Sequence, residues 1–143
     1  MKKKILLIGS GGREHALAWK IRQSPLCGDL FVAPGNAGTA TLGENVSIDA
    51  KDIASIVSFA KEKSIDLVVV APDDPLALGA VDSLTEAGIR AWGPTASAAQ
   101  LESSKAFAKE VMVSAGIPTA RYETFSDFES ASAYCDGLPA PIV

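Results

Sequence analysis

The sequence predicts an α/β protein built on a mainly parallel sheet with helices on both faces. Two short apolar runs, Ile5–Ile8 and Leu67–Ala71, have the continuous apolar character of strands that are buried on both faces. Segments with apolar residues at helical spacing alternate with such runs, and glycine or proline punctuates the alternation. A repeated strand–helix–strand order is typical of a parallel sheet with crossover helices.

The elements of this first part follow one another as far as Pro94. The predicted strands are Ile5–Ile8, Leu30–Ala33, Asn45–Ile48, Leu67–Ala71 and Arg90–Trp92. The predicted helices cover Glu14–Gln23, the apolar stripe Ile53, Ile56, Val57 and Ala60, and the apolar stripe Ala77, Ala80, Val81 and Leu84, which ends at Gly88. Asp49 and Asp52 are both candidate caps for the second helix.

The pattern changes after Pro94, and we predict two domains, residues 1–95 and residues 96–143. The second part is expected to hold a helix that ends at Gly116, a strand over Arg121–Phe125 and a short helix opened by Ser126 with Glu129. Residues 139–143 read as the entry to a further strand. The apolar stripe of the helix is Ala108, Val111, Met112 and Ala115.

Composition and charge exclude several classes of protein. The chain has 143 residues, with 13 Lys and Arg against 17 Asp and Glu, and therefore a formal net charge of −4. This balance argues against a generic nucleic-acid binder, and the apolar runs are too short to cross a membrane. We expect a cytoplasmic protein in which Cys27 and Cys135, which lie far apart and show no metal-binding spacing, are free thiols.

A glycine-rich segment, Gly9–Ala16, follows the first predicted strand and opens the first predicted helix. Glycine lets the backbone turn sharply and approach a ligand closely, and a helix N-terminus offers free N–H groups to a phosphate. Arg13 can add a charge-assisted contact. The segment therefore predicts an anion site, with a tight turn that holds no ligand as the alternative.

The same segment does not match a dinucleotide-binding fingerprint. Glu14 stands where the third glycine of that motif is required, and the second strand ends in Val32-Ala33-Pro34-Gly35 without the acidic residue that would hold a ribose. A nicotinamide-dependent oxidoreductase is therefore disfavoured.

Three further segments are candidates for ligand contact. The loop Pro34–Thr39 and the segment Pro72–Pro75 follow the second and third clear strands, so both are expected at the carboxyl edge of the sheet, where ligands bind in open α/β folds. The aspartates in Pro72–Pro75 could equally cap the next helix. Lys105 lies in the first turn of a predicted helix, where it opposes the helix dipole and prefers a nearby anion; a solvated surface lysine is the alternative.

Four strings in the same order resemble the glycinamide ribonucleotide synthetase family, also called phosphoribosylamine–glycine ligases, of the ATP-grasp superfamily. The strings are Gly9-Ser-Gly-Gly-Arg-Glu-His-Ala16, Pro34-Gly-Asn-Ala-Gly-Thr39, Gly93-Pro94-Thr95 and Ser104-Lys-Ala-Phe-Ala-Lys109. The resemblance implies a Rossmann-like (pre-ATP-grasp) domain over residues 1–95 and the beginning of an ATP-grasp domain over 96–143. It also implies the family reaction of purine biosynthesis, in which ATP, glycine and 5-phosphoribosylamine give glycinamide ribonucleotide, ADP and phosphate.

The resemblance also assigns residues to ligands. Lys105 is expected to contact the nucleotide phosphates, and Asp73 stands where the family usually carries Glu. The residues assigned to the phosphoribosylamine pocket are Gly9, Ser10, Gly11, Gly12, Arg13, Glu14, His15, Pro34, Gly35, Asn36, Gly38, Thr39, Pro72 and Asp73. The magnesium ligands, a second nucleotide lysine and a glycine-rich flap are expected beyond residue 143. We therefore expect that this chain alone does not catalyse ligation; a free-standing domain that binds or senses a phosphate ligand is the alternative.

Overall fold

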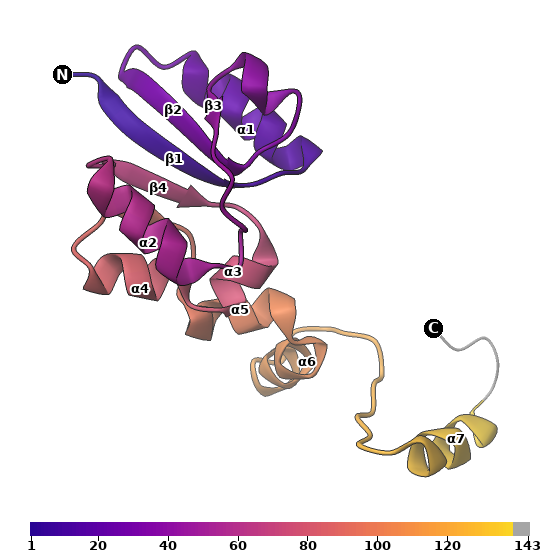
Figure 1. Ribbon diagram of the computed structural model, residues 1–143. Coiled ribbons are helices and arrows are strands. Elements are labelled where there is room, and N and C mark those ends of the chain that lie inside the picture. Colours follow the sequence, from indigo (N-terminus) through magenta and orange to yellow (C-terminus); the bar gives the residue numbers. More distant parts are fainter. Residues whose placement is uncertain (139–143) are drawn as a thin grey trace. The chain divides into compact units, whose positions relative to one another are not determined.

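The computed structural model describes residues 1–138 (Figure 1). The chain divides into two compact units, Met1–Ser103 and Ser104–Val143, of which the second is described as far as Leu138. The first unit holds a five-stranded sheet and most of the helices. The strands are β1 (Lys3–Gly9), β2 (Cys27–Pro34), β3 (Glu44–Asn45), β4 (Leu67–Val70) and β5 (Ala91–Trp92). The helices of this unit are α1 (Gly12–Arg22), the short 3-10 helix η1 (Thr39–Thr41), α2 (Ile53–Glu62), α3 (Asp73–Ala77), α4 (Ala80–Glu86) and α5 (Ala96–Ser103).

The sheet has the order β3-β2-β1-β4-β5, and all four strand pairings are parallel. The predicted α/β class is confirmed. In the register, Leu7 of β1 lies beside Val32 of β2 and Val69 of β4. Because side chains alternate between the faces along each strand, this row points to one face and the neighbouring row, which contains Leu6 and Ile8, points to the other.

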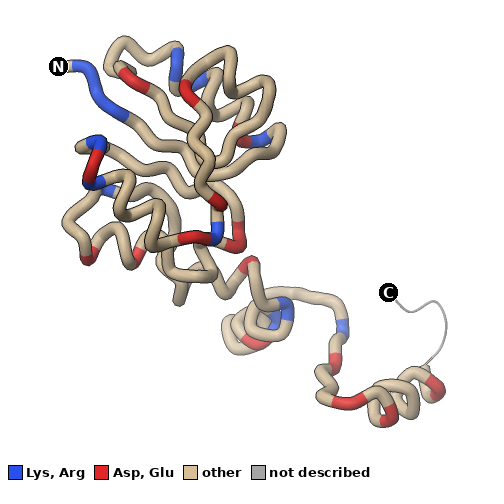
Figure 2. Tube along the Cα trace, viewed as in Figure 1, with Lys and Arg blue, Asp and Glu red and all other residues tan. Residues whose placement is uncertain are grey.

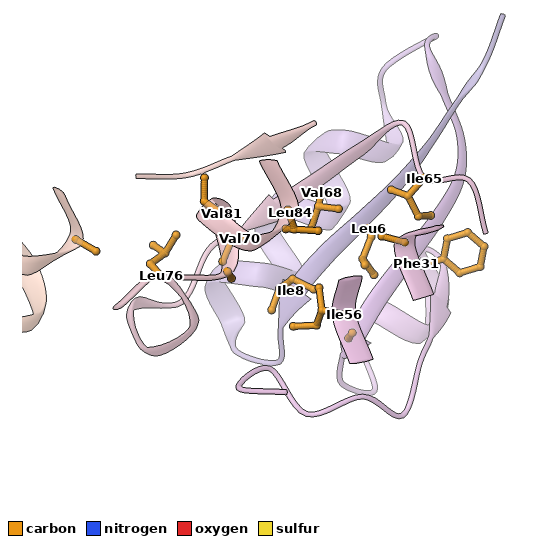
Figure 3. Packing of buried hydrophobic residues seen from close by; sticks show 14 residues of the cluster. Leu6, Ile8, Phe31, Ile56, Ile65, Val68, Val70, Leu76, Val81 and Leu84 are labelled. Carbon is orange, nitrogen blue, oxygen red and sulfur yellow. The ribbon is translucent and has the colours of Figure 1, made fainter. Parts of the chain in front are cut away.

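Helices cover the two faces unequally. The face that carries Leu6 and Ile8 packs against helices α2 and α4, with Ile56 and Leu84 fully buried (Figure 3). The opposite face packs against α1, whose Ala18 lies with Leu7 and Val32 in a second, smaller apolar cluster. Both clusters lie entirely in the first unit, which therefore has its own hydrophobic core.

The helix predicted from the stripe that contains Ala77 and Ala80 is interrupted. Gly79 adopts the left-handed conformation (φ 81°, ψ 29°), so α3 ends before it and α4 begins after it. A left-handed residue cannot continue an α-helix, and glycine adopts this conformation without a Cβ penalty. Apolar spacing alone does not show such an interruption.

Two further expectations for the first unit need correction. The strand predicted over Asn45–Ile48 is only two residues long and ends at Asn45, because the Ile48 N–H donates to the carbonyl of Val46 and so turns the chain away from β2. Helix α5, Ala96–Ser103, was missed because it is rich in alanine and serine and carries only one buried residue, Ala99. The predicted domain boundary after Thr95 stays a prediction; the compact units divide after Ser103.

The second unit contains two helices in its described residues, α6 (Lys105–Ser114) and α7 (Phe128–Asp136). The predicted helix before Gly116 is confirmed, but the strand predicted over Arg121–Phe125 is wrong: residues 104–138 contain no strand with which it could pair. The cap of α7 is Asp127, whose carboxylate accepts from the Ser130 N–H at 2.8 Å, and not Ser126. The strand entry expected at 139–143 lies outside the described residues.

Both cysteines are free thiols, Cys27 buried and Cys135 exposed. Across residues 1–138, no helix is both long and apolar enough to span a membrane. Charged residues of both signs are spread over the chain (Figure 2).

Candidate functional site

Three of the loops singled out in the sequence meet at the carboxyl edge of the sheet. They are the β1–α1 turn, the loop after β2 and the segment after β4. Parallel strands end at the same edge, so these loops are neighbours although they are separated in sequence. The contacts below join the three loops into one surface.

Gly9 is the point at which the loops after β1 and β4 touch. Its φ of +124° lies in a region that residues with a side chain rarely adopt. A Cβ at this position would lie 2.5 Å from Cγ of Glu14 and 2.9 Å from Cγ of Pro72. Both the backbone conformation and the close packing therefore require glycine here.

Asn36 ties the loop after β2 to the β1–α1 turn. Its amide Nδ2 donates to the carbonyls of Ser10, at 2.8 Å, and Gly11, at 3.2 Å. The Gly35 N–H donates to the carbonyl of Gly9 at 3.1 Å. These bonds hold the two loops side by side.

The loop after β2 is also ordered from within. Oδ1 of Asn36 accepts from the N–H groups of Gly38, at 2.8 Å, and Thr39, at 3.0 Å. The fully buried Thr39 hydroxyl accepts from the Asn36 N–H at 2.7 Å and lies 2.7 Å from Oδ1 of Asn45. The side chains of Asn36 and Thr39 thus form hydrogen bonds within the loop. Their contact with substrate stays a prediction.

Asn45 is a part of this arrangement that the sequence did not reveal. Its Nδ2 donates to the carbonyl of Asn36 at 2.8 Å while its Oδ1 faces the Thr39 hydroxyl. Its position at the end of the two-residue β3 brings it beneath the loop. An asparagine nine residues after Asn36 carries no local sequence signal for such a contact.

Glu14 is buried, with 4% of its side chain exposed. Its Oε2 accepts from the Gly11 N–H at 2.7 Å, and its Oε1 accepts from Nε of Arg13 at 3.1 Å. The carboxylate therefore accepts a hydrogen bond from one of the N–H groups at the start of α1 that would otherwise be free to bind a phosphate. Glu14, which stands where the dinucleotide fingerprint requires glycine, therefore binds the backbone of its own β1–α1 turn.

Arg13 is the cation of this surface, and 60% of its side chain is exposed. Hydrogen bonding and charge attraction to Glu14 raise the pKa of its guanidinium, and the charges of Asp73 and Glu102 raise it slightly further. Arg13 therefore stays charged and lies close enough to Asp73 to sense its charge.

His15 and Asp74 complete the description of the loops. A Cβ on Gly38 would lie 2.5 Å from Cε1 of His15, so the exposed imidazole packs directly on that glycine. Asp74 forms an ion pair with Lys51 at 2.5 Å, which raises the pKa of Lys51. Asp73 and Asp74 are the first two residues of α3, where their charges complement the helix dipole, but neither is its cap: the N-cap is Pro72, and no side chain caps the helix.

The exposed groups at the centre of this surface suit an anionic or hydroxyl-rich ligand. Ser10, Gly11 and Gly12 are exposed, and the first-turn N–H groups of Gly12 and Arg13 have no carbonyl one turn earlier in α1 to bind. Together with the Arg13 guanidinium they form a set of donors at one edge of the sheet. The carboxylate of Asp73 supplies an acceptor nearby.

Lys105 belongs to the second unit. It is the first residue of α6, it is exposed, and the Ser104 hydroxyl caps the helix by accepting from the Phe107 N–H at 3.3 Å. Among residues 1–138, no three acidic, histidine or cysteine side chains gather where they could hold a metal ion.

The sequence matches two family models and many known proteins. The family model described as phosphoribosylglycinamide synthetase, N domain, matches residues 3–102, and the model of the ATP-grasp (A) domain of the same enzyme matches residues 103–143. The phosphoribosylamine–glycine ligases of Vibrio parahaemolyticus and Allochromatium vinosum are 54% and 55% identical over 142 residues, which is 98% of this chain. The chain spans 33% of the length of each of these relatives.

Solved structures of related proteins also match this chain. The crystal structure of phosphoribosylamine–glycine ligase from Thermotoga maritima is 31% identical, with a TM-score of 0.59 over 84% of this chain and 27% of that protein. A biotin carboxylase domain from Hydrogenobacter thermophilus matches 99% of this chain and 34% of its own at a TM-score of 0.74 and 18% identity, a likeness of fold alone. With most of its length matched by the N-domain model and the rest by the A-domain model, the chain belongs to the phosphoribosylglycinamide synthetase family.

Proposed function

We propose that this chain serves the phosphoribosylamine–glycine ligase reaction by forming part of the pocket for 5-phosphoribosylamine. The observation that carries the proposal is the meeting of three loops at the carboxyl edge of the sheet. Two of them, Gly9–Ala16 and Pro34–Thr39, are strings that resemble the family, and the third carries Asp73 where the family usually has Glu. The close relatives carry the name of this ligase.

The proposal divides the site residues into two groups. Ser10, Gly11, Gly12 and Arg13 contact the ligand, because their backbone or side chains are exposed at the edge. Gly9, Glu14, Pro34, Gly35, Asn36, Gly38, Thr39 and Pro72 shape the loops from behind. His15 and Asp73 flank the ligand, where an imidazole and a carboxylate can bind a ribose hydroxyl or an amine.

In the ligase reaction, this surface would position phosphoribosylamine and neutralise the charge of its phosphate. The carboxylate of glycine takes the γ-phosphoryl group of ATP and releases ADP; the amine of phosphoribosylamine then attacks the acyl phosphate, forms the amide and releases phosphate and a proton. Holding the amine near the acyl phosphate makes the second step effectively unimolecular. Arg13 and the first-turn N–H groups of α1 would hold the phosphate or hydroxyl groups of the phosphoribosyl moiety.

ATP and magnesium belong to the same proposal. Lys105 would contribute one cation to the nucleotide phosphates, and a bound magnesium ion would neutralise phosphate charge during transfer. The described residues do not themselves gather a set of magnesium ligands.

The first experiment is a calorimetric titration of the chain with glycinamide ribonucleotide, with a parallel titration of ATP and magnesium. We expect ribonucleotide binding that is lost in Gly11→Asp, which places a carboxylate among the anion donors, and weakened at least tenfold in Arg13→Ala, a loss of about 1.4 kcal/mol or more. Lys20→Ala is the matched control, because it removes a positive charge from the exposed far end of the same helix.

Tight ATP binding without ribonucleotide binding would contradict the assignment of these loops. A second assay uses a chimera in which this chain replaces the matching third of the Vibrio relative. ADP release that depends on both glycine and phosphoribosylamine supports the ligase proposal; a chimera that folds but turns over no substrate favours the alternative of a domain that binds or senses a phosphate ligand.

A further inference from the structure

Helix α1 packs on one face of the sheet over β1 and β2, and the part of the same face towards β5, the bare region, has no helix of the first unit over it. The row Leu7, Val69 and Trp92 points to this face, because Leu7 pairs with Val69 and Val69 pairs with Trp92 in register. Leu7 is fully buried and Val69 is 8% exposed, but Trp92 is 62% exposed. Cover on this face therefore decreases from β1 towards β5.

The path of the chain explains the bare region. Helix α1, which connects β1 to β2, packs on this face, whereas α2 and α4 pack on the opposite face. Both connections that lead to β4 and β5 thus place their helices on the far side of the sheet. Within the first unit, α1 is the only helix that packs on this face.

A cavity of about 800 Å³ adjoins the bare region, and its lining extends around the amino edge of the sheet to Thr85, Gly88 and Ile89 at the end of α4. Its apolar floor and wall come from Ile5, Leu67, Leu26 and Trp92, and Leu26 is 62% exposed. Its lining also includes charged residues: Lys3 and Asp66 form an ion pair at 2.7 Å, and Arg90 contributes a further positive charge. An apolar surface that also carries charged residues has the composition of a protein interface.

A parallel sheet is stable when both of its faces are covered. Here the uncovered residues include the large apolar side chains of Trp92 and Leu26, which line the same cavity and are each 62% exposed. Exposed apolar surface of this kind marks an interaction site. The relatives supply a source of cover, because about two-thirds of their length lies outside the part that this chain matches.

We propose that this groove, lined by Ile5, Leu26, Leu67 and Trp92, is the docking surface for the part of the ligase that lies outside the matched third. The groove includes Lys3, Asp66 and Arg90, at the amino ends of β1, β4 and β5, whereas the candidate substrate loops lie at the carboxyl ends. Docking there fixes the first unit in the enzyme and leaves the substrate edge open. The proposal rests on the proposed function, in which this chain is part of the ligase, but it does not depend on which loops hold the substrate.

The test compares two tryptophans that are almost equally exposed in this chain. Trp19, on the outer side of α1, is 57% exposed and serves as the control for Trp92. Hydroxyl-radical labelling with mass spectrometry is applied to the 143-residue chain and to the chimera that carries the remaining two-thirds of the Vibrio relative.

We expect both tryptophans to be labelled at similar rates in the chain alone, at every protein concentration. In the chimera, labelling of Trp92 should fall about fivefold or more, as for a residue in the core of an interface, while Trp19 keeps its rate. Trp92→Glu should lower the melting temperature of the chimera and leave that of the chain alone unchanged; Trp19→Glu should change neither.

Three results would overturn the proposal. Equal labelling of Trp92 in chain and chimera would show that the groove stays open. Protection that rises with the concentration of the chain alone would identify a second copy as the occupant. Protection in the chain alone at all concentrations would identify residues of this chain as the cover.

Discussion

At the scale of single residues, the candidate site depends on the buried Glu14, whose carboxylate holds the β1–α1 turn in shape. Glu14 accepts the Gly11 N–H and holds Arg13 by its Nε atom. It thereby fixes the two groups that the proposed function assigns to the substrate. A residue of this kind affects binding through the positions of its neighbours.

Replacement of Glu14 tests this role. Glu14→Ala leaves the Gly11 N–H without its carboxylate and should cost about 1–3 kcal/mol of unfolding free energy. Glu14→Gln keeps an oxygen acceptor and should cost less. Urea denaturation at neutral pH measures both, with the exposed Glu86→Ala as the control; equal stability of Glu14→Ala and the control would contradict the structural role.

At the scale of elements, Gly79 separates two helices that the apolar pattern joins. Gly79→Ala should cost about 1–2 kcal/mol, because a Cβ is unfavourable in the left-handed conformation. A Cβ on Gly79 would make only ordinary contacts, at 3.9 Å from Cβ of Ala96 and Oδ2 of Asp82, so the cost isolates the backbone conformation. Gly12→Ala, at a helical position with no neighbour within 4 Å of the added Cβ, should stay within about 0.5 kcal/mol in the same urea titration.

The cap of α2 predicts a pH dependence. Hydrogen bonds from the side chain and backbone N–H of Ser55 lower the pKa of the Asp52 carboxyl below its ordinary value. A lowered pKa in the folded state stabilises the protein above the unfolded pKa and loses that effect as the pH falls through the folded value. Asp52→Ala should therefore lower the urea midpoint at pH 7, and the difference from the parent should shrink as the pH falls through the folded pKa, to the part that a neutral cap still contributes.

The matched variant Asp52→Asn separates the charge from the cap. Asparagine caps a helix without titrating in this range, so its difference from Asp52→Ala should stay constant as the pH falls. A difference between Asp52→Ala and the parent that is independent of pH would show that the carboxylate charge contributes nothing.

What the sequence could predict follows from how local each signal is. Buried strands and amphipathic helices are local patterns, and so is the glycine-rich turn, which explains why β1, β4 and α2 were found. The contact of Asn45 with Thr39 and the interruption at Gly79 depend on backbone conformation and on pairing across loops. The strand expected at Arg121–Phe125 has a suitable local pattern, but residues 104–138 offer it no partner strand.

At the scale of the whole molecule, the two apolar clusters predict that the first unit folds by itself. Every buried residue of both clusters lies between Leu6 and Ala99. A chain truncated after Ser103 should therefore unfold with a free energy within about 0.5 kcal/mol of that of the first unit in the 143-residue chain. Circular dichroism in urea measures both; a large loss on truncation would show that later residues complete the core.

The two outermost strands, β3 and β5, are each two residues long. An exposed strand edge invites another chain to add to the sheet by backbone pairing, and very short edge strands are one way in which proteins prevent it. This sheet therefore presents almost no template for aggregation at either edge. Its associations with other polypeptides are left to side chains on its faces, whose shapes and charges can discriminate between partners as a backbone ladder cannot.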